Sequence, residues 1–289
     1  MKVGFAGLGR MGARMAANLA GAGYEVILWN RSPGKARDLA TATGAASVPS
    51  PRALAEAADI VVTMLADDAS SEAVHFGPEG LFAGARATHF VEMGTMSPDH
   101  IAALADAAPN GRVVIDAPVS GATQAAEDAQ LLIMAGCSQD MLAPIQPLFD
   151  AMGKQTICLG RTGAGAVMKL AVNMLIHGIN QTFAEAMTLA EATGIPTEAA
   201  FEAIEASAAC APMLTYRKPL YLDEAAHDVT FTVALAQKDM RVTAELAEKL
   251  GVPLPQSRVT LDILTEAAGA GYDARDMAAI LTYMRGKQT

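Results

Sequence analysis

The stretch KVGFAGLGRMGARMAANLAGAGYEVILWNR, residues 2–31, decides the fold. Its apolar start predicts a strand over 2–6 that opens directly into a glycine turn, followed by a helix over 13–22 and a second strand over 25–29. In this context a G-x-G-x-x-G turn is a strong signal for dinucleotide binding. Gly7 permits the tight turn, Gly9 lets the backbone approach a pyrophosphate, and Gly12 lets the helix pack on the strand. We therefore expect an α/β Rossmann-type doubly wound sheet whose cofactor-binding turn comprises Gly7, Leu8, Gly9, Arg10, Met11 and Gly12.

The end of the second strand indicates which dinucleotide binds. An acidic residue there would hold the 2′-hydroxyl of the adenosine ribose and repel a 2′-phosphate. This chain has neutral Asn30 followed by Arg31, with Lys35 one turn further on. The planar fork of an arginine suits a phosphate group. The pattern favours NADP over NAD as the cofactor, and the alternative is that Arg31 is a solvated surface arginine.

Helices and short apolar strands continue to alternate up to residue 159, as in a parallel sheet. We expect helices over 35–43 and 51–57, a helix that begins at Ser97-Pro98, and strands over 60–64, 88–92 and 112–116. Strands over 131–135 and 156–159, with a helix over 139–152 between them, are expected to close the same sheet. The carboxyl ends of parallel strands meet at the ligand crevice, so Leu65 and Thr95 are candidate cofactor contacts. The loop APVSGAT, residues 117–123, offers free backbone N–H groups to a carboxylate.

A second decisive stretch is GAGAVMKLAVNMLIHGINQTFAEAMTLAEATG, residues 163–194. It lacks proline and its apolar residues occupy most of the helix circumference, which predicts a long buried helix. Helical spacing places Lys169, Asn173, His177 and Asn180 in one polar strip. Burying a charged lysine is costly. We therefore interpret Lys169 as an acid/base group that faces a cleft, and the alternative is a lysine that reaches the surface and pairs with an acid.

After residue 163 we expect helices only, over 197–207, 232–250, 256–268 and 275–285. The chain is therefore predicted to form two domains, an NADP-binding Rossmann domain over 1–162 and an all-α domain for substrate binding and oligomerisation over 163–289, joined through the long helix. Lys238-Asp239 is a charged pair in an otherwise apolar part of the 232–250 helix. A surface ion pair and a functional pair are both open at this point.

Composition excludes several classes of function. The net charge of −10 argues against a surface for nucleic acid or anionic membranes. The three cysteines, Cys137, Cys158 and Cys210, have no paired short spacing, which is typical of reduced thiols and predicts neither a disulfide framework nor a metal site. Glycines interrupt the start of the chain, and Lys169 and Asn173 interrupt its longest apolar run. We therefore expect a soluble, cytoplasmic protein without a signal peptide or membrane span.

Five motifs occur in a familiar order: GLGRMG, EMGTMSP, DAPVSGA, GAGAVMKLAVN and LAQKDM. In this order the chain resembles the β-hydroxyacid dehydrogenase family, which includes 3-hydroxyisobutyrate dehydrogenase, tartronate semialdehyde reductase and the glyoxylate/succinic semialdehyde reductases. The resemblance implies a Rossmann domain, a helical domain and an active site between them. It also implies roles for single residues: Lys169 as the catalytic lysine, Asn173 as the substrate-orienting amide, Ser120 and Gly121 in the substrate-carboxylate loop, Thr95 at the cofactor, and Lys238 reaching the cofactor site.

The chain departs from the family pattern at Ala122, which replaces the second glycine of the Ser-Gly-Gly loop. The run Ala125-Ala126-Glu127-Asp128 resembles the glyoxylate/succinic semialdehyde branch but lacks its proline. The expected function is NADP-dependent interconversion of a small carboxylate-bearing semialdehyde or keto acid and its hydroxyacid. Two alternatives remain: an imine reductase, against which Lys169 counts, and a non-catalytic cofactor-binding sensor or scaffold. The apolar helices and the resemblance predict a homodimer or homotetramer.

Overall fold

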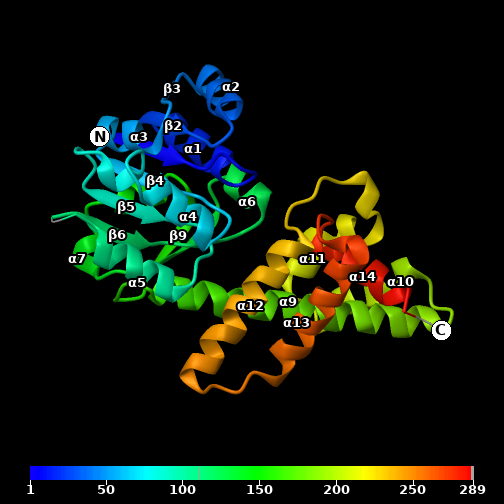
Figure 1. Cartoon of the computed structure of the whole chain (residues 1–289). Coiled ribbons are helices and arrows are strands. Elements are labelled where there is room, and N and C mark those ends of the chain that lie inside the picture. Colours follow the sequence, from blue (N-terminus) through cyan, green and yellow to red (C-terminus); the bar gives the residue numbers. More distant parts are fainter. Residues whose placement is uncertain (110, 288–289) are drawn as a thin grey trace. The chain divides into compact units, whose positions relative to one another are not determined.

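The computed structural model describes residues 1–109 and 111–287 of the chain (Figure 1). The chain divides into two compact units, Met1–Lys169 and Leu170–Thr289. The long helix α9 (Ala164–Ala192) is continuous through the point of division. An α/β unit is thus followed by an all-helical one, and the predicted fold class is confirmed.

The first unit contains a six-stranded parallel sheet. Its strand order is β3-β2-β1-β4-β5-β6, in which neighbours are not always consecutive in the chain. This is the order of a doubly wound dinucleotide-binding sheet, and its direction of winding reverses between β1 and β4. The strands are β1 (Lys2–Ala6), β2 (Glu25–Trp29), β3 (Ala46–Ser47), β4 (Ile60–Thr63), β5 (His89–Glu92) and β6 (Val113–Asp116).

Helices cover both faces of this sheet, which is why its central strands are apolar without alternation. On one face Met15 and Leu19 of α1 pack in the same core cluster as Phe5 of β1. On the other face Leu54 of α3 packs with Phe90 of β5. The helical elements before the second sheet are α1 (Gly12–Gly21), α2 (Pro33–Thr43), α3 (Pro51–Ala57), α4 (Asp68–His75), η1 (Leu81–Ala83) and α5 (Pro98–Ala107).

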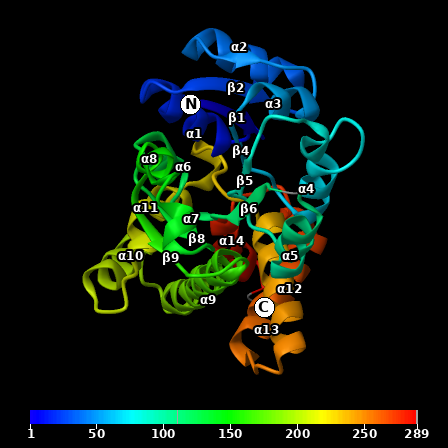
Figure 2. The ribbon, with the colours of Figure 1, turned by 90° about the vertical axis from the view of Figure 1, so that its left-hand side faces the viewer.

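The prediction that residues 131–135 and 156–159 close the Rossmann sheet is wrong. They belong to a separate three-stranded sheet of β7 (Val119–Ser120), β8 (Leu131–Ala135) and β9 (Gly153–Cys158). The second sheet lies beside β6 (Figure 2), and an isolated bridge joins Asp116 to Gly136. The chain leaves the first sheet at Pro118, which has no N–H group for a ladder. β7 then pairs antiparallel with β8.

The predicted helix over 139–152 is two short helices, α7 (Gln139–Leu142) and α8 (Gln146–Asp150). Pro144 lies between them, and Pro147 stands in the first turn of α8. A proline in a helix interior removes a hydrogen bond and clashes with the preceding turn, so the single helix is interrupted. The remaining short helix of this unit is α6 (Thr123–Glu127).

The second unit is built on the C-terminal part of α9. Phe183 and Met187 of α9 share one core with Phe201, Tyr221 and Met240 from later helices. α12 and α13 run side by side (Figure 1). The later elements are α10 (Thr197–Ala206), α11 (Pro212–Leu222), η2 (Glu224–Ala226), α12 (Val233–Leu250), α13 (Pro255–Ala267), η3 (Ala268–Tyr272), η4 (Met277–Ala279) and α14 (Ile280–Arg285).

The predicted helix over 275–285 begins later than expected, because Asp276 is extended and caps η4. The helix α11 was not predicted, since Pro219 lies inside it. Within residues 1–109 and 111–287, no helix is long and apolar enough to span a membrane.

Candidate active site

The glycine turn between β1 and α1 is tightly constrained at two of its glycines. Gly7 has φ +95°, and a Cβ on it would stand 2.4 Å from the carbonyl oxygen of Met64. A Cβ on Gly12 would stand 2.0 Å from the carbonyl oxygen of Gly7. By contrast, Gly9 is exposed, and a Cβ there would meet nothing within 4 Å. The turn therefore leaves its backbone open on the side of Gly9, as a bound pyrophosphate requires.

Asn30 stabilises this turn through two hydrogen bonds that the sequence did not predict. Its Oδ1 accepts a hydrogen bond from the backbone N–H of Leu8 at 2.9 Å. Its Nδ2 donates to the carbonyl oxygen of Ser32 at 3.1 Å. The amide thus ties the glycine turn to the chain after β2. An amide suits this position because it can accept one hydrogen bond and donate another.

A cleft of about 880 Å³ lies where the direction of winding reverses. Its walls include Gly7 and Gly9, the segment from Trp29 to Arg31, and Leu65, which follows β4. The lining also includes residues that the sequence analysis did not identify: Ala66, Asp67, Ala69, Ser70, Ala73, Val74, Phe76, Gly77, Pro78, Glu79 and Gly80. A cleft of this size at the carboxyl ends of parallel strands suits a nucleotide cofactor.

The two basic residues predicted near the cofactor differ in position. Arg31 is exposed and forms part of the cleft wall. Lys35, in the first turn of α2, is exposed and lies outside the cleft lining. The geometry therefore brings Arg31 to the cleft, but it does not bring Lys35 there.

Thr95 follows β5 and is half-buried. The segment that carries it is held by Glu92, whose Oε1 accepts the backbone N–H of Gly94 at 3.2 Å. The other oxygen of Glu92 accepts the hydroxyl of Ser71 at 2.7 Å. Burial raises the pKa of Glu92 to about 7, although the hydrogen bonds from Ser71, Thr63 and Gly94 oppose the rise.

The candidate carboxylate loop follows the two-residue strand β7. Ser120 is half-buried and Gly121 is exposed, with φ +139°, a backbone conformation that a side chain would strain. A Cβ on Gly121 would also stand 2.9 Å from the side chains of Ala125 and Leu131. Ala122 has φ −78° and ψ −177°, which is extended backbone that any residue adopts. The alanine therefore fits this loop without backbone strain.

The polar strip predicted along α9 is buried. The exposed fraction is 9% for Lys169 and 3% for Asn173. Nδ2 of Asn173 donates a hydrogen bond of 2.5 Å to Oδ2 of Asp239 on α12. Nζ of Lys238 lies 2.8 Å from Oδ1 of the same carboxylate. Since Asp239 is only 1% exposed, the Lys238–Asp239 pair is not a surface ion pair.

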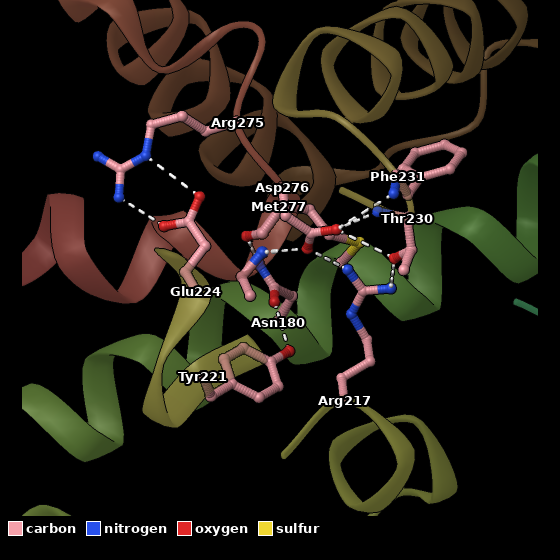
Figure 3. Close-up of polar contacts among 10 residues, drawn as sticks. Asn180, Arg217, Tyr221, Glu224, Thr230, Phe231, Arg275, Asp276 and Met277 are labelled. Carbon is pink, nitrogen blue, oxygen red and sulfur yellow. Dashed lines mark hydrogen bonds and ion pairs between the residues drawn. The ribbon is translucent and has the colours of Figure 1, made fainter. Parts of the chain in front are cut away.

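The strip continues through two further buried residues. The ring of His177 stacks on that of Phe231, with centroids 5.7 Å apart. Asn180 donates to the carbonyl oxygen of Met277 at 3.0 Å and accepts the hydroxyl of Tyr221 at 2.6 Å, as Figure 3 shows. The strip thus forms hydrogen-bonded and stacked contacts with later elements of the helical unit.

The segment that carries Phe231 is fixed by Asp276, which is fully buried (Figure 3). Its carboxylate pairs with the buried guanidinium of Arg217 and accepts the backbone N–H groups of Thr230 and Phe231 at 2.9 and 3.2 Å. Burial would raise the pKa of Asp276, but Arg217 and these N–H donors together hold it below its usual value. The network stabilises the chain between α11 and α12.

No cluster of three or more histidine, cysteine or acidic residues suited to a metal ion occurs in the described part of the chain. The candidate groups of the first unit are the glycine turn with its cleft and the loop at Ser120. Those of the helical unit are the buried polar groups of α9 and α12.

Comparison with known proteins identifies both halves of the chain. Residues 2–160 match the family model for the NAD-binding domain of 6-phosphogluconate dehydrogenase. Residues 163–284 match the model described as NAD-binding of NADP-dependent 3-hydroxyisobutyrate dehydrogenase.

Whole-chain relatives agree with these matches. Glyoxylate/succinic semialdehyde reductase 2 of Arabidopsis thaliana is 30% identical, over 100% of this chain and 81% of its own length. The 2-(hydroxymethyl)glutarate dehydrogenase of Eubacterium barkeri is 31% identical, over 97% of this chain and 94% of its own length. The solved 3-hydroxyisobutyrate dehydrogenase of Mycobacterium tuberculosis, with L-serine, is 28% identical and superposes with a TM-score of 0.85, over 98% of this chain and 99% of its own. The chain therefore belongs to the β-hydroxyacid dehydrogenase family of NAD(P)-dependent oxidoreductases.

Proposed function

We propose that this protein is an NADP-dependent reductase of a small carboxylate-bearing semialdehyde or keto acid, with Lys169 as the general acid/base. The observation that carries the proposal is a lysine only 9% exposed on α9, one helical turn before an amide fixed by a buried carboxylate. A cofactor-binding scaffold has no need of this arrangement, because burying the lysine and Asp239 costs free energy. The semialdehyde reductase and dehydrogenase relatives support the substrate class.

The residues of the first unit suit a nicotinamide dinucleotide. Gly9 leaves the backbone open to a pyrophosphate, and Arg31 stands on the cleft wall where a 2′-phosphate would need a cation. When bound, the reduced cofactor supplies hydride to the substrate carbonyl carbon. We assign cofactor binding to residues 1–162, and substrate binding and oligomerisation mainly to residues 163–289.

Lys169 donates the proton in reduction and accepts it in oxidation. As a carbonyl becomes an alkoxide, its oxygen gains negative charge, and an ammonium within hydrogen-bond reach donates a proton to it. In the oxidative direction the neutral amine accepts that proton. Asn173 donates one of its two side-chain N–H groups to Asp239. Its second N–H is suited to bind the same substrate oxygen.

The loop at Ser120 would hold the substrate carboxylate. Gly121 keeps a backbone conformation that only glycine adopts readily, and a hydroxyl stands directly before it. Holding the carboxylate fixes which face of the carbonyl meets the hydride donor. Orientation of this kind accounts for a large part of enzymatic rate enhancement.

A substrate panel tests the proposal. Purified protein is assayed with NADPH and with NADH against glyoxylate, succinic semialdehyde, an uncharged aldehyde of similar length and a cyclic imine. We expect turnover of a carboxylate-bearing aldehyde with NADPH, and much weaker turnover of the uncharged aldehyde. Turnover of the imine alone would support an imine reductase instead. Cofactor binding without turnover of any compound would support a sensor or scaffold.

A further inference from the structure

Asp116, the last residue of β6, holds the start of the helix that carries Lys169. It is fully buried. Its Oδ1 accepts the backbone N–H of Gly163 at 2.8 Å, and its Oδ2 accepts that of Ala166 at 2.9 Å. These two donors lie just before α9 and in its first turn.

The first N–H groups of any helix have no partner within the helix. A side chain directly before the helix usually supplies the acceptor. In α9 the acceptor comes instead from a strand 47 residues earlier in the chain. Burial raises the pKa of Asp116 to about 6, and the N–H groups of the helix start oppose the rise. A negative charge on this carboxylate is favoured by the dipole of α9, because the carboxylate lies at the N-terminus of the helix.

The carboxylate and the helix start are packed so closely that neither can shift freely. A Cβ on Gly136 would stand 2.2 Å from Oδ1 of Asp116. A Cβ on Gly165 would stand 2.4 Å from the carbonyl oxygen of Met134 and 2.9 Å from Oδ2 of Asp116. Glycine at both positions lets the first turn of α9 lie directly against β6 and β8.

We propose that Asp116 is the positioning residue of Lys169, which it holds by anchoring the first turn of α9 to the carboxyl end of β6. Lys169 follows Ala166 by three residues, so the two lie one turn apart on neighbouring parts of the helix surface. A displacement of Ala166 therefore displaces the lysine. The inference rests on the proposed function of Lys169 as the acid/base group.

Kinetics of Asp116 variants test the inference. In Asp116→Asn one side-chain oxygen still accepts an N–H, while the new amide nitrogen faces the other donor. In Asp116→Ala both acceptors are gone. We expect kcat to fall about tenfold in the first and about a hundredfold in the second, since small misplacements cost rates of this order. The KM for substrate and the Kd for NADPH should stay at their wild-type values. The Kd is read from the fluorescence of Trp29, the one tryptophan of the chain, which lines the cofactor cleft.

A second variant keeps the test decisive if the Asp116 variants fail to fold. Gly136→Ala keeps the aspartate, but the added methyl group would overlap its carboxylate and must displace it from the start of α9. It should therefore lower kcat with unchanged KM and Kd. The matched control is Gly178→Ala on α9 itself, where an added Cβ meets nothing within 4 Å, and it should keep wild-type kcat.

The kcat of Lys169→Ala distinguishes failure of the positioning role of Asp116 from failure of the proposed function. If that variant loses turnover while Asp116→Asn and Gly136→Ala both keep wild-type kcat, the positioning role is overturned and the proposed function stands. If Lys169→Ala itself keeps kcat, the proposed function fails, and the positioning role fails with it. Parallel losses of cofactor affinity and kcat in the Asp116 variants would also overturn the inference, because they would indicate a general disturbance of the sheet.

Discussion

Asn173 on α9 donates a hydrogen bond of 2.5 Å to the carboxylate of Asp239 on α12. The carboxylate is buried and also pairs with Lys238, so one acid fixes two residues to which the family resemblance gives functional roles. The two hydrogen-bonding side chains are 66 residues apart in the chain. The bond therefore locks the position of α12 along α9 within the helical unit.

Replacing Asp239 with alanine should lower kcat by about tenfold or more, because the Asn173 amide loses the partner that orients it. Stability should fall by about 1–3 kcal/mol, the usual cost of leaving a buried polar group unsatisfied. Steady-state kinetics and urea unfolding measure both effects. The control is Asp262→Ala, which removes an exposed carboxylate from α13. Equal effects in the two variants would contradict a specific role for Asp239.

Lys169→Ala should lower kcat by about a hundredfold to ten-thousandfold, the usual range for a positioned acid/base. Cofactor affinity should hardly change, because the proposed function assigns cofactor binding to the glycine turn and Arg31. The comparison variant is Lys238→Ala, which should weaken cofactor binding more than the chemical step. Kinetics under conditions limited by chemistry, with Trp29 fluorescence for binding, distinguish the two. Wild-type kcat in Lys169→Ala would falsify the assigned mechanism.

Local patterns in the sequence were sufficient to predict the glycine turn and the polar strip of α9. Both depend on spacing within a single element, such as the four residues between Lys169 and Asn173. Ser97 was likewise predicted to begin a helix, and its hydroxyl accepts the N–H of His100 at 3.0 Å. These features need no knowledge of what packs against them.

The features that were missed depend on distant partners or on weak local signals. Nothing near Asp116 in the sequence indicates that its carboxylate binds the start of a helix 47 residues later. The part of the cleft lining that α4 contributes was not predicted, because the segment of this helix has little apolar periodicity. A signal was present there: Asp67 and Ser70 form a capping box, with hydrogen bonds of 2.8 and 3.2 Å between side chain and backbone.

Arg31→Ala should raise the KM for NADPH about tenfold or more and leave that for NADH nearly unchanged. A charged hydrogen bond to phosphate contributes about 1.5–3 kcal/mol. Lys35→Ala is the matched control, because Lys35 is an exposed cation outside the cleft lining. Its effect on NADPH should be much smaller. Equal responses of the two cofactors to Arg31→Ala would mean that Arg31 does not bind the 2′-phosphate.

A homodimer or homotetramer is expected in solution. The helical unit exposes large apolar side chains, including Leu175 at 60%, Leu189 at 72% and Leu250 at 63%. Exposed apolar surface of this kind is a common site of association. Light scattering at micromolar concentration should therefore give at least twice the chain mass of 29.9 kDa. Leu189→Lys should reduce the measured mass, and a wild-type monomer would contradict association.

The last prediction concerns the buried carboxyl group of Glu92. Its pKa is about 7 in the folded protein, against an ordinary value of 4.5. Between these two pH values the unfolded chain has lost the proton that the folded protein still holds. Folding stability due to this group is therefore fully present below pH 4.5 and is lost as the pH rises toward 7 and above. The loss amounts to at most about 3 kcal/mol.

Glu92→Gln removes this titration, because an amide stays neutral at every pH. The variant should have nearly wild-type stability at pH 4.5 and should gain on the wild type as the pH rises to 8. Urea unfolding of both proteins across this range gives the difference directly.

His75, whose pKa burial lowers to about 4, is present in both proteins, so its contribution largely cancels. The control is Glu72→Gln, an exposed carboxylate on α4. A pH-dependent gain of the same size in the control would assign the effect to the lost charge and not to burial. A difference in unfolding free energy between Glu92→Gln and the wild type that stays constant with pH would show that Glu92 is ionised in the folded protein across the whole range.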